Sequence, residues 1–253
     1  MMFLVNRPVA LFFVTVVLLW ASCRGGAELR SRWKPLPEAA RGDFGVVLSA
    51  ILTLLGLIIG FTFSMATTRY DQRKNLEEEE ANAIGTEYVR VDFLPAEDAA
   101  RLKGMLRMYT QLRVEFYSVP YGQGLDRVND ETARMQDELW TTVAQAAKVQ
   151  PTPLAALASG GMNDVLNSQG YTQAAWWNRI PMSAWGLLFL IAIMSTFLVG
   201  YGATAKWGLF SIVFPLAIGI SFFLIADIDT PRGGIIYVRA VNLEVLNRSL
   251  TGH

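Results

Sequence analysis

Two carboxylates, Asp227 and Asp229, follow the last long apolar stretch of this sequence, just before Pro231. Carboxylates at a membrane edge are costly unless they are paired or hydrated, so this pair is a candidate cation site. Calcium usually takes about six or more oxygen ligands, however, and these residues supply only part of such a set. A helix end in which Asp229 bonds backbone N–H groups, or a salt bridge to Arg232, explains the same residues without a metal. We therefore expect both carboxylates to have a structural role.

Four consecutive glutamates, Glu77 to Glu80, also have the composition of a cation site. Consecutive residues of a helix point in different directions, so four adjacent carboxylates cannot share one ion. Arg73 with Glu77 and Lys74 with Glu78 have the i,i+4 spacing of helical ion pairs. We interpret the run as a solvated, salt-bridged helix face.

The sequence offers few other groups for chemistry. Its single cysteine, Cys23, excludes an intrachain disulfide and a thiolate metal cluster. Its single histidine, His253, is the last residue, which argues against histidine-based catalysis. No Walker loop, nucleophile elbow, zinc spacing or dinucleotide fingerprint is present. We expect no enzyme activity, cofactor or metal, and the formal net charge of zero predicts no nucleic-acid partner.

Small residues recur at helical spacing in the second long apolar stretch. They are Ser49, Thr53, Gly56, Gly60 and Ser64, here called the small-residue stripe. Steps of three or four residues place them on one face of a helix. Gly56 and Gly60 form a GxxxG pattern, which lets two helices approach closely. We interpret the stripe as a packing face, and a pore-lining face is the alternative.

The elements that position these residues are membrane helices, because 52% of the chain is hydrophobic and the apolar residues gather in blocks. Each block has nearly the length that crosses a bilayer, and lipid leaves helices as their only plausible form. The first block is either a signal peptide or, in our preferred interpretation, an uncleaved span. We predict spans at 1–23, 44–66, 182–202 and 207–226, followed by a polar C-terminal tail at 227–253.

Residues 67–180 are polar and have helical periodicity throughout, so we predict a soluble helical bundle between the second and third spans. Pro95 should end the helix that continues from the second span. Pro151 and Pro153 should end a later helix, and Gly160-Gly161 should interrupt the one after it. The fold class is therefore all-α, with about four transmembrane helices.

The basic residues around the spans bear on which side of the membrane the 67–180 domain lies, and they point in two directions. Five of them between the first two spans would hold that loop in the cytoplasm and place the 67–180 domain outside. Basic residues after the second and fourth spans favour the opposite arrangement. These two groups are Arg24, Arg30, Arg32, Lys34 and Arg41, and Arg69, Arg73, Lys74, Arg232 and Arg239. We interpret the domain as extracytoplasmic.

Three segments carry a family resemblance: Arg69-Tyr70-Asp71, residues 80–95 (EANAIGTEYVRVDFLP) and residues 227–234 (DIDTPRGG). With them, the chain from about 37 to 245 resembles the bacterial bestrophin-like membrane proteins. The resemblance implies kinship with the bestrophins, which are pentameric anion channels with four spans and a helical domain between the second and third.

The resemblance also implies roles for particular residues. Bestrophins carry a hydrophobic neck on the second span, and Leu55, Ile59 and Phe63 have its i, i+4, i+8 spacing. We expect Leu55, Ile58 and Phe63 to lie on a different side of the helix from the small-residue stripe, which leaves them free to meet lipid or a pore. Asp227 and Asp229 resemble in position the acidic cluster of calcium-gated members. The implied location is the bacterial inner membrane, with lipid, further copies of the chain and an anion as partners.

Two functions remain open. An oligomeric ion channel, for anions, agrees with the arrangement of spans and with the resemblance. A non-conducting membrane scaffold or sensor, whose helical domain binds a partner, would use the same faces equally well.

Overall fold

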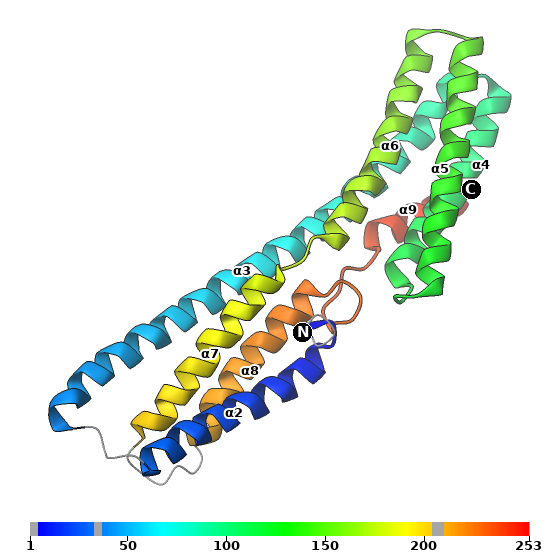
Figure 1. Ribbon diagram of the computed structural model, residues 1–253. Helices are drawn as coiled ribbons and strands as arrows, with labels where there is room; N and C mark the ends of the chain where they lie inside the picture. Colours follow the sequence, from blue (N-terminus) through cyan, green and yellow to red (C-terminus); the bar gives the residue numbers. More distant parts are fainter. Residues whose placement is uncertain (1–4, 33–36, 204–209, 253) are drawn as a thin grey trace. The chain divides into compact units, whose positions relative to one another are not determined.

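The computed structural model describes residues 5–32, 37–203 and 210–252, and the regular elements in this part of the chain are helices. The chain divides into two compact units (Figure 1). Met1–Arg69 and Arg179–Tyr237 form the first, here called the span unit. Tyr70–Asn178 and Val238–His253 form the second, here called the helical unit.

The span unit contains α2 (Pro8–Arg32), α7 (Met182–Gly202), α8 (Phe210–Asp229) and the first part of α3 (Glu38–Arg90). Figure 1 shows α2, α7 and α8 side by side, and α2 contacts both of the others. Their shared core includes Leu19, Trp185 and Phe222, and the ring centroids of the two aromatic residues lie 6.1 Å apart. Four helices in the described residues are long and apolar enough to cross a membrane, which agrees with the predicted fold class.

Glycines bring α2 and α7 into close contact. A Cβ built on Gly200 would lie 2.8 Å from the carbonyl carbon of Cys23, and closer still to its oxygen. A Cβ on Gly26 would lie 2.9 Å from the backbone nitrogen of Tyr201. Nearby, Arg30 Nη1 donates to the carbonyls of Gly202 and Ala203 at 2.7 and 2.6 Å, which satisfies the end of α7. The first block is thus an integral part of the span unit's packing.

The helical unit consists of the rest of α3, η1 (Val91–Phe93), α4 (Ala96–Ser118), α5 (Gln123–Val149), α6 (Pro153–Trp177) and α9 (Val241–Thr251). Pro95 caps the start of α4, and Thr152 Oγ1 accepts a hydrogen bond from Ala155 N at the start of α6. Leu102, Leu106, Leu139 and Val165 lie in the core of this unit, whose full membership is larger.

Three local predictions need revision. Gly160-Gly161 does not interrupt α6, which is continuous from Pro153 to Trp177, and Gly161 instead meets a buried side chain of α3. The helix of the fourth span extends to Asp229, beyond the predicted end at 226. The segment expected as a polar tail contains α9, whose Leu243 and Leu250 are buried. The predicted start of the fourth span, 207–209, lies outside the described residues, as does His253.

Candidate functional site

The first candidate site is the membrane-spanning part of α3, which has few partners within its own chain. Only 6% of its apolar 18-residue stretch is buried, whereas 28%, 33% and 44% of the corresponding stretches are buried in the other three candidate spans. The small-residue stripe lies entirely on the exposed side, and a Cβ on Gly56 or Gly60 would meet nothing within 4 Å. Among the described residues of the subunit, these glycines therefore have no close-packed neighbour.

The proposed neck residues lie differently from the expectation. Leu55 is 3% exposed and belongs to the core of the span unit, and Ile59 packs partly against that core. Leu55 is therefore not free to meet lipid or a pore, contrary to the expectation, whereas Phe63 is 42% exposed. The large apolar residues next to the stripe on the exposed side are instead Leu57 and Phe61, at 52% and 65% exposure. The i,i+4 spacing of Leu57 and Phe61 places them one turn apart on that side.

The two aspartates after the fourth span are both buried, and each has its own partners in the span unit. Asp227 accepts hydrogen bonds from Ile235 N at 2.7 Å and Ile236 N at 2.8 Å, which holds the turn that follows α8. Asp229 accepts a bond from Ile180 N at 3.2 Å, at the approach to α7. The expected turn geometry thus applies to Asp227, while Asp229 reaches a distant segment of the chain.

Arginine side chains surround Asp229. Its carboxylate lies 3.7 Å from Arg69 Nη1 and 3.4 Å from Arg179 Nε. Arg179 also bonds Asn6 and, at 2.9 Å, Thr230 Oγ1. Two guanidinium groups provide the positive charge that a cation would otherwise supply. Among the described residues, no group of three or more His, Cys, Asp or Glu side chains could hold a metal ion.

In the helical unit, the glutamate run of α3 is only half solvated. Glu78 and Glu79 are exposed, but Glu77 and Glu80 are buried, so the expectation of a solvated face is wrong for those two. Glu77 accepts bonds from Leu243 N at 2.9 Å and Asn242 Nδ2 at 2.7 Å. Burial raises the pKa of Glu77, and these donors oppose that rise. A carboxylate at the first turn of α9 complements the helix dipole and anchors α9 to α3.

Glu80 forms a fully buried ion pair with Arg113 of α4, and Thr172 of α6 donates to its second oxygen at 3.2 Å. The guanidinium of Arg113 also lies 4.4 Å from the ring centroid of Phe116. This network joins three helices, so it contributes to the specificity of their packing. The helical spacing of Glu77, Glu80 and the apolar Ile84 was the signal in the sequence that these carboxylates share an inward face.

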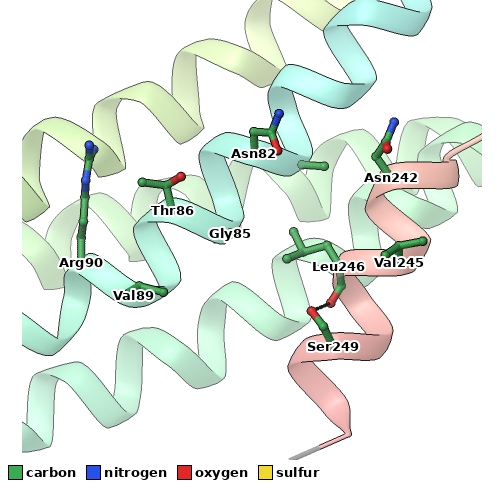
Figure 2. A pocket seen from close by; sticks show the side chains of 10 residues that line it. Asn82, Gly85, Thr86, Val89, Arg90, Asn242, Val245, Leu246 and Ser249 are labelled. Atoms are coloured by element: carbon green, nitrogen blue, oxygen red, sulfur yellow. Dashed lines mark hydrogen bonds between the residues drawn. The ribbon is translucent and has the colours of Figure 1, made fainter.

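A groove of about 640 Å³ lies between α3 and α9, within the helical unit. Figure 2 shows its two walls, with Gly85 of α3 facing Leu246 of α9. A Cβ on Gly85 would lie 3.2 Å from Leu246 Cδ1, so the two helices are close at this point. The remaining lining residues mix polar and apolar types: Ala81, Asn82, Thr86, Val89, Arg90, Asn242, Val245 and Ser249.

The sequence matches the Bestrophin-like domain over residues 10–243. The chain belongs to the Bestrophin-like family. This assignment confirms the resemblance carried by the segments near Arg69, Glu80 and Asp227. A search of the curated proteins found no match.

The fold of this Bestrophin-like chain is similar to several solved structures. One is a bacterial bestrophin homologue from Klebsiella pneumoniae with a tryptophan replaced by alanine, with a TM-score of 0.69 at 13% identity, covering 96% of this chain and 97% of that chain. The same homologue solved by Zn-SAD phasing has a TM-score of 0.64 at 14% identity, and the match covers 96% of this chain and 97% of that chain. A membrane protein with a glycine replaced by alanine has a TM-score of 0.66 at 13% identity, and the match covers 97% of this chain and 98% of that chain. At these identities the likeness shows the shared fold.

Proposed function

We propose that copies of this chain assemble in the bacterial inner membrane into a homo-oligomeric channel that conducts anions. The exposed side of α3 would face neighbouring copies and a shared central pathway. The observation that carries this proposal is the exposure of α3: only 6% of its apolar 18-residue stretch is buried in the single chain.

The composition of that exposed side supports assembly better than it supports contact with lipid. Glycine, serine and threonine offer little surface for dispersion contacts with lipid tails, but they let helices approach closely. Gly56 and Gly60 have open space around them in the subunit, so their small size is not explained by the subunit's own packing. A neighbouring copy or a water-filled pathway explains it.

Leu57 and Phe61 are the side chains best placed to narrow such a pathway. Both are more than half exposed, and they stand one helical turn apart beside the small-residue stripe. Rings of apolar side chains can gate a pore by excluding water. We therefore assign the neck to Leu57 and Phe61. Leu55 lies in the core of the span unit and Ile59 packs against that core, so these two residues do not form it.

The polar groups on the pathway side would be hydroxyls. Residues 44–66 contain no charged side chain, so no carboxylate there repels an anion. The hydroxyls of Ser49, Thr53 and Ser64 can each donate a hydrogen bond to one. This agrees with the anion conduction that the family resemblance implies.

A single introduced cysteine tests the arrangement, because the one native thiol, Cys23, is buried. Thr53→Cys and the control Val213→Cys, on the exposed side of α8, are reconstituted and recorded in planar bilayers under a chloride gradient. We expect anion-selective currents in both, reduced by a charged thiol reagent only in Thr53→Cys. Absence of current, or block through Val213→Cys alone, contradicts the proposal.

The groove between α3 and α9 favours a second candidate, a non-conducting scaffold or sensor. Its mixed lining and volume would suit a bound partner segment. If reconstituted protein is oligomeric but passes no ions, while Val89→Asp in the groove abolishes binding of a partner, this candidate replaces the channel.

A further inference from the structure

Among the described residues, Glu87 of α3 has no hydrogen-bond partner, in contrast to the buried Glu77 and Glu80 of the same helix. Its side chain is fully buried, and neither carboxyl oxygen has a partner among the described residues. Glu77 and Glu80, by contrast, accept bonds from α9, α4 and α6. An ionised carboxylate in this condition is strongly disfavoured, whereas a neutral carboxyl group is tolerated.

The surroundings of Glu87 are closed on the side of α6. A Cβ on Gly161 would collide with Glu87 Oε2, so α6 can pass this point only because residue 161 is a glycine. The carboxyl group is thus pressed against the backbone of a neighbouring helix. The pKa of Glu87 is raised to about 8, chiefly because burial disfavours the charged form; the positive charge of Arg90 opposes this rise, and the negative charge of Asp164 adds to it. The group lies in the helical unit, well beyond the predicted span at 44–66.

Two charged groups act on Glu87, one from each helix at this contact. Arg90 follows it by one turn on α3, and Asp164 lies on α6. Arg90 Nη1 stands 3.9 Å from Asp164 Oδ2, and their side chains are 30% and 67% exposed. A long and exposed ion pair of this kind contributes little stability, so Arg90 can exchange partners at small cost.

We infer that Glu87 is a proton-operated switch in the contact between α3 and α6. When Glu87 is protonated, its neutral carboxyl group lies against Gly161, and Arg90 pairs with Asp164. When the proton leaves to solvent, the carboxylate attracts Arg90 away from Asp164, and the contact at Gly161 opens. The switch belongs to the helical unit, so it does not depend on ion conduction.

The sign of the stability change follows from the raised pKa. Between the ordinary carboxyl pKa and about 8, the folded chain holds a proton that the unfolded chain has lost. This contribution to stability is complete at acidic pH, falls as the pH rises through that window, and is constant above it. Glu87→Gln mimics the neutral form and lacks the titration.

The test compares full-length wild type with Glu87→Gln, using Glu78→Gln on the exposed side of α3 as the matched control. Wild type and Glu87→Gln should melt at similar temperatures near pH 5, and the melting temperature of wild type should fall increasingly below that of Glu87→Gln as the pH rises to about 8. Hydrogen exchange of the amides around Gly161 should be faster in wild type than in Glu87→Gln at about pH 9, and equal at about pH 6. A constant melting difference, or equal exchange at both values, overturns the switch.

A second measurement keeps the inference testable if Glu87→Gln fails to fold. Infrared titration of the wild type should show a protonated carboxyl group that ionises near pH 8. Asp164→Asn, at an exposed position, should move that transition to lower pH, and Arg90→Gln should move it to higher pH. A titration that neither substitution moves would show that the proton sits elsewhere.

Discussion

Replacing Gly200 with alanine adds one methyl group at the point where α2 and α7 cross. That methyl would lie 2.8 Å from the carbonyl carbon and 3.1 Å from the Cα of Cys23. Ordinary van der Waals contact begins at 3.4 Å, so one helix must move by at least 0.6 Å. The obstacle is backbone, which cannot rotate away as a flexible side chain can.

The expected cost is that of overpacking a tight contact, about 1–3 kcal/mol. Alanine regains about 1 kcal/mol in helix propensity over glycine, so the net destabilisation should be roughly 0–2 kcal/mol. For a chain of this length, that corresponds to a melting temperature lower by up to about 8 °C. The assay is thermal unfolding in mild detergent, read by fluorescence and by size-exclusion chromatography after heating.

Gly186→Ala is the matched control, because Gly186 lies on the same helix and a Cβ there would meet nothing within 4 Å. It should leave the melting temperature unchanged or raise it slightly. If Gly200→Ala is as stable as Gly186→Ala, the close crossing of α2 and α7 does not exist in the folded protein, and the reasoning is refuted.

Further substitutions test three of the buried carboxylates. Glu80→Gln should destabilise by about 3–5 kcal/mol in denaturant unfolding, because it leaves Arg113 buried without its counter-charge. Glu77→Ala, but not the exposed control Glu78→Ala, should release α9 and speed proteolysis there, at a cost of about 0.5–2 kcal/mol as for a lost helix cap. Asp229→Asn should lower the yield of monodisperse protein, and Asp229→Ala should lower it further. Calcium-dependent stabilisation of wild type that is lost in Asp229→Asn would instead indicate a metal site.

Helix boundaries could be predicted wherever the backbone itself forbids continuation. Pro95 is the N-cap residue of α4, and Pro153 is the first residue of α6, directly after the Thr152 cap. Proline is tolerated at these positions because the backbone N–H that it lacks has no partner within the helix there. The expectation that Gly160-Gly161 interrupts α6 is wrong, because a glycine pair weakens a helix without breaking it. Its cost of about 1 kcal/mol per residue is offset when the helix packs against a neighbour.

The buried carboxylates could not be predicted with the same ease. Four adjacent glutamates suggest solvent, and only the helical phase separates Glu77 and Glu80 from Glu78 and Glu79. Deciding which phase faces inward requires the partners, Arg113 and the first turn of α9, which are remote in sequence. The same limitation applies to Gly26 and Gly200, since neither belongs to a GxxxG pattern and only the fold brings them to one crossing.

The glycines of the candidate spans have two different surroundings in the subunit. Gly26 and Gly200 are surrounded by backbone, so the folding of the subunit alone explains why no larger residue fits. Gly56 and Gly60 stand in open space, so the subunit would fold equally well with larger residues there. Gly60→Leu should therefore keep the melting behaviour of the dissociated subunit and change only assembly or ion flux. If it unfolds the subunit instead, the exposed side of α3 is not the assembly surface. If it assembles normally but alters flux, the small-residue stripe lines the pathway itself.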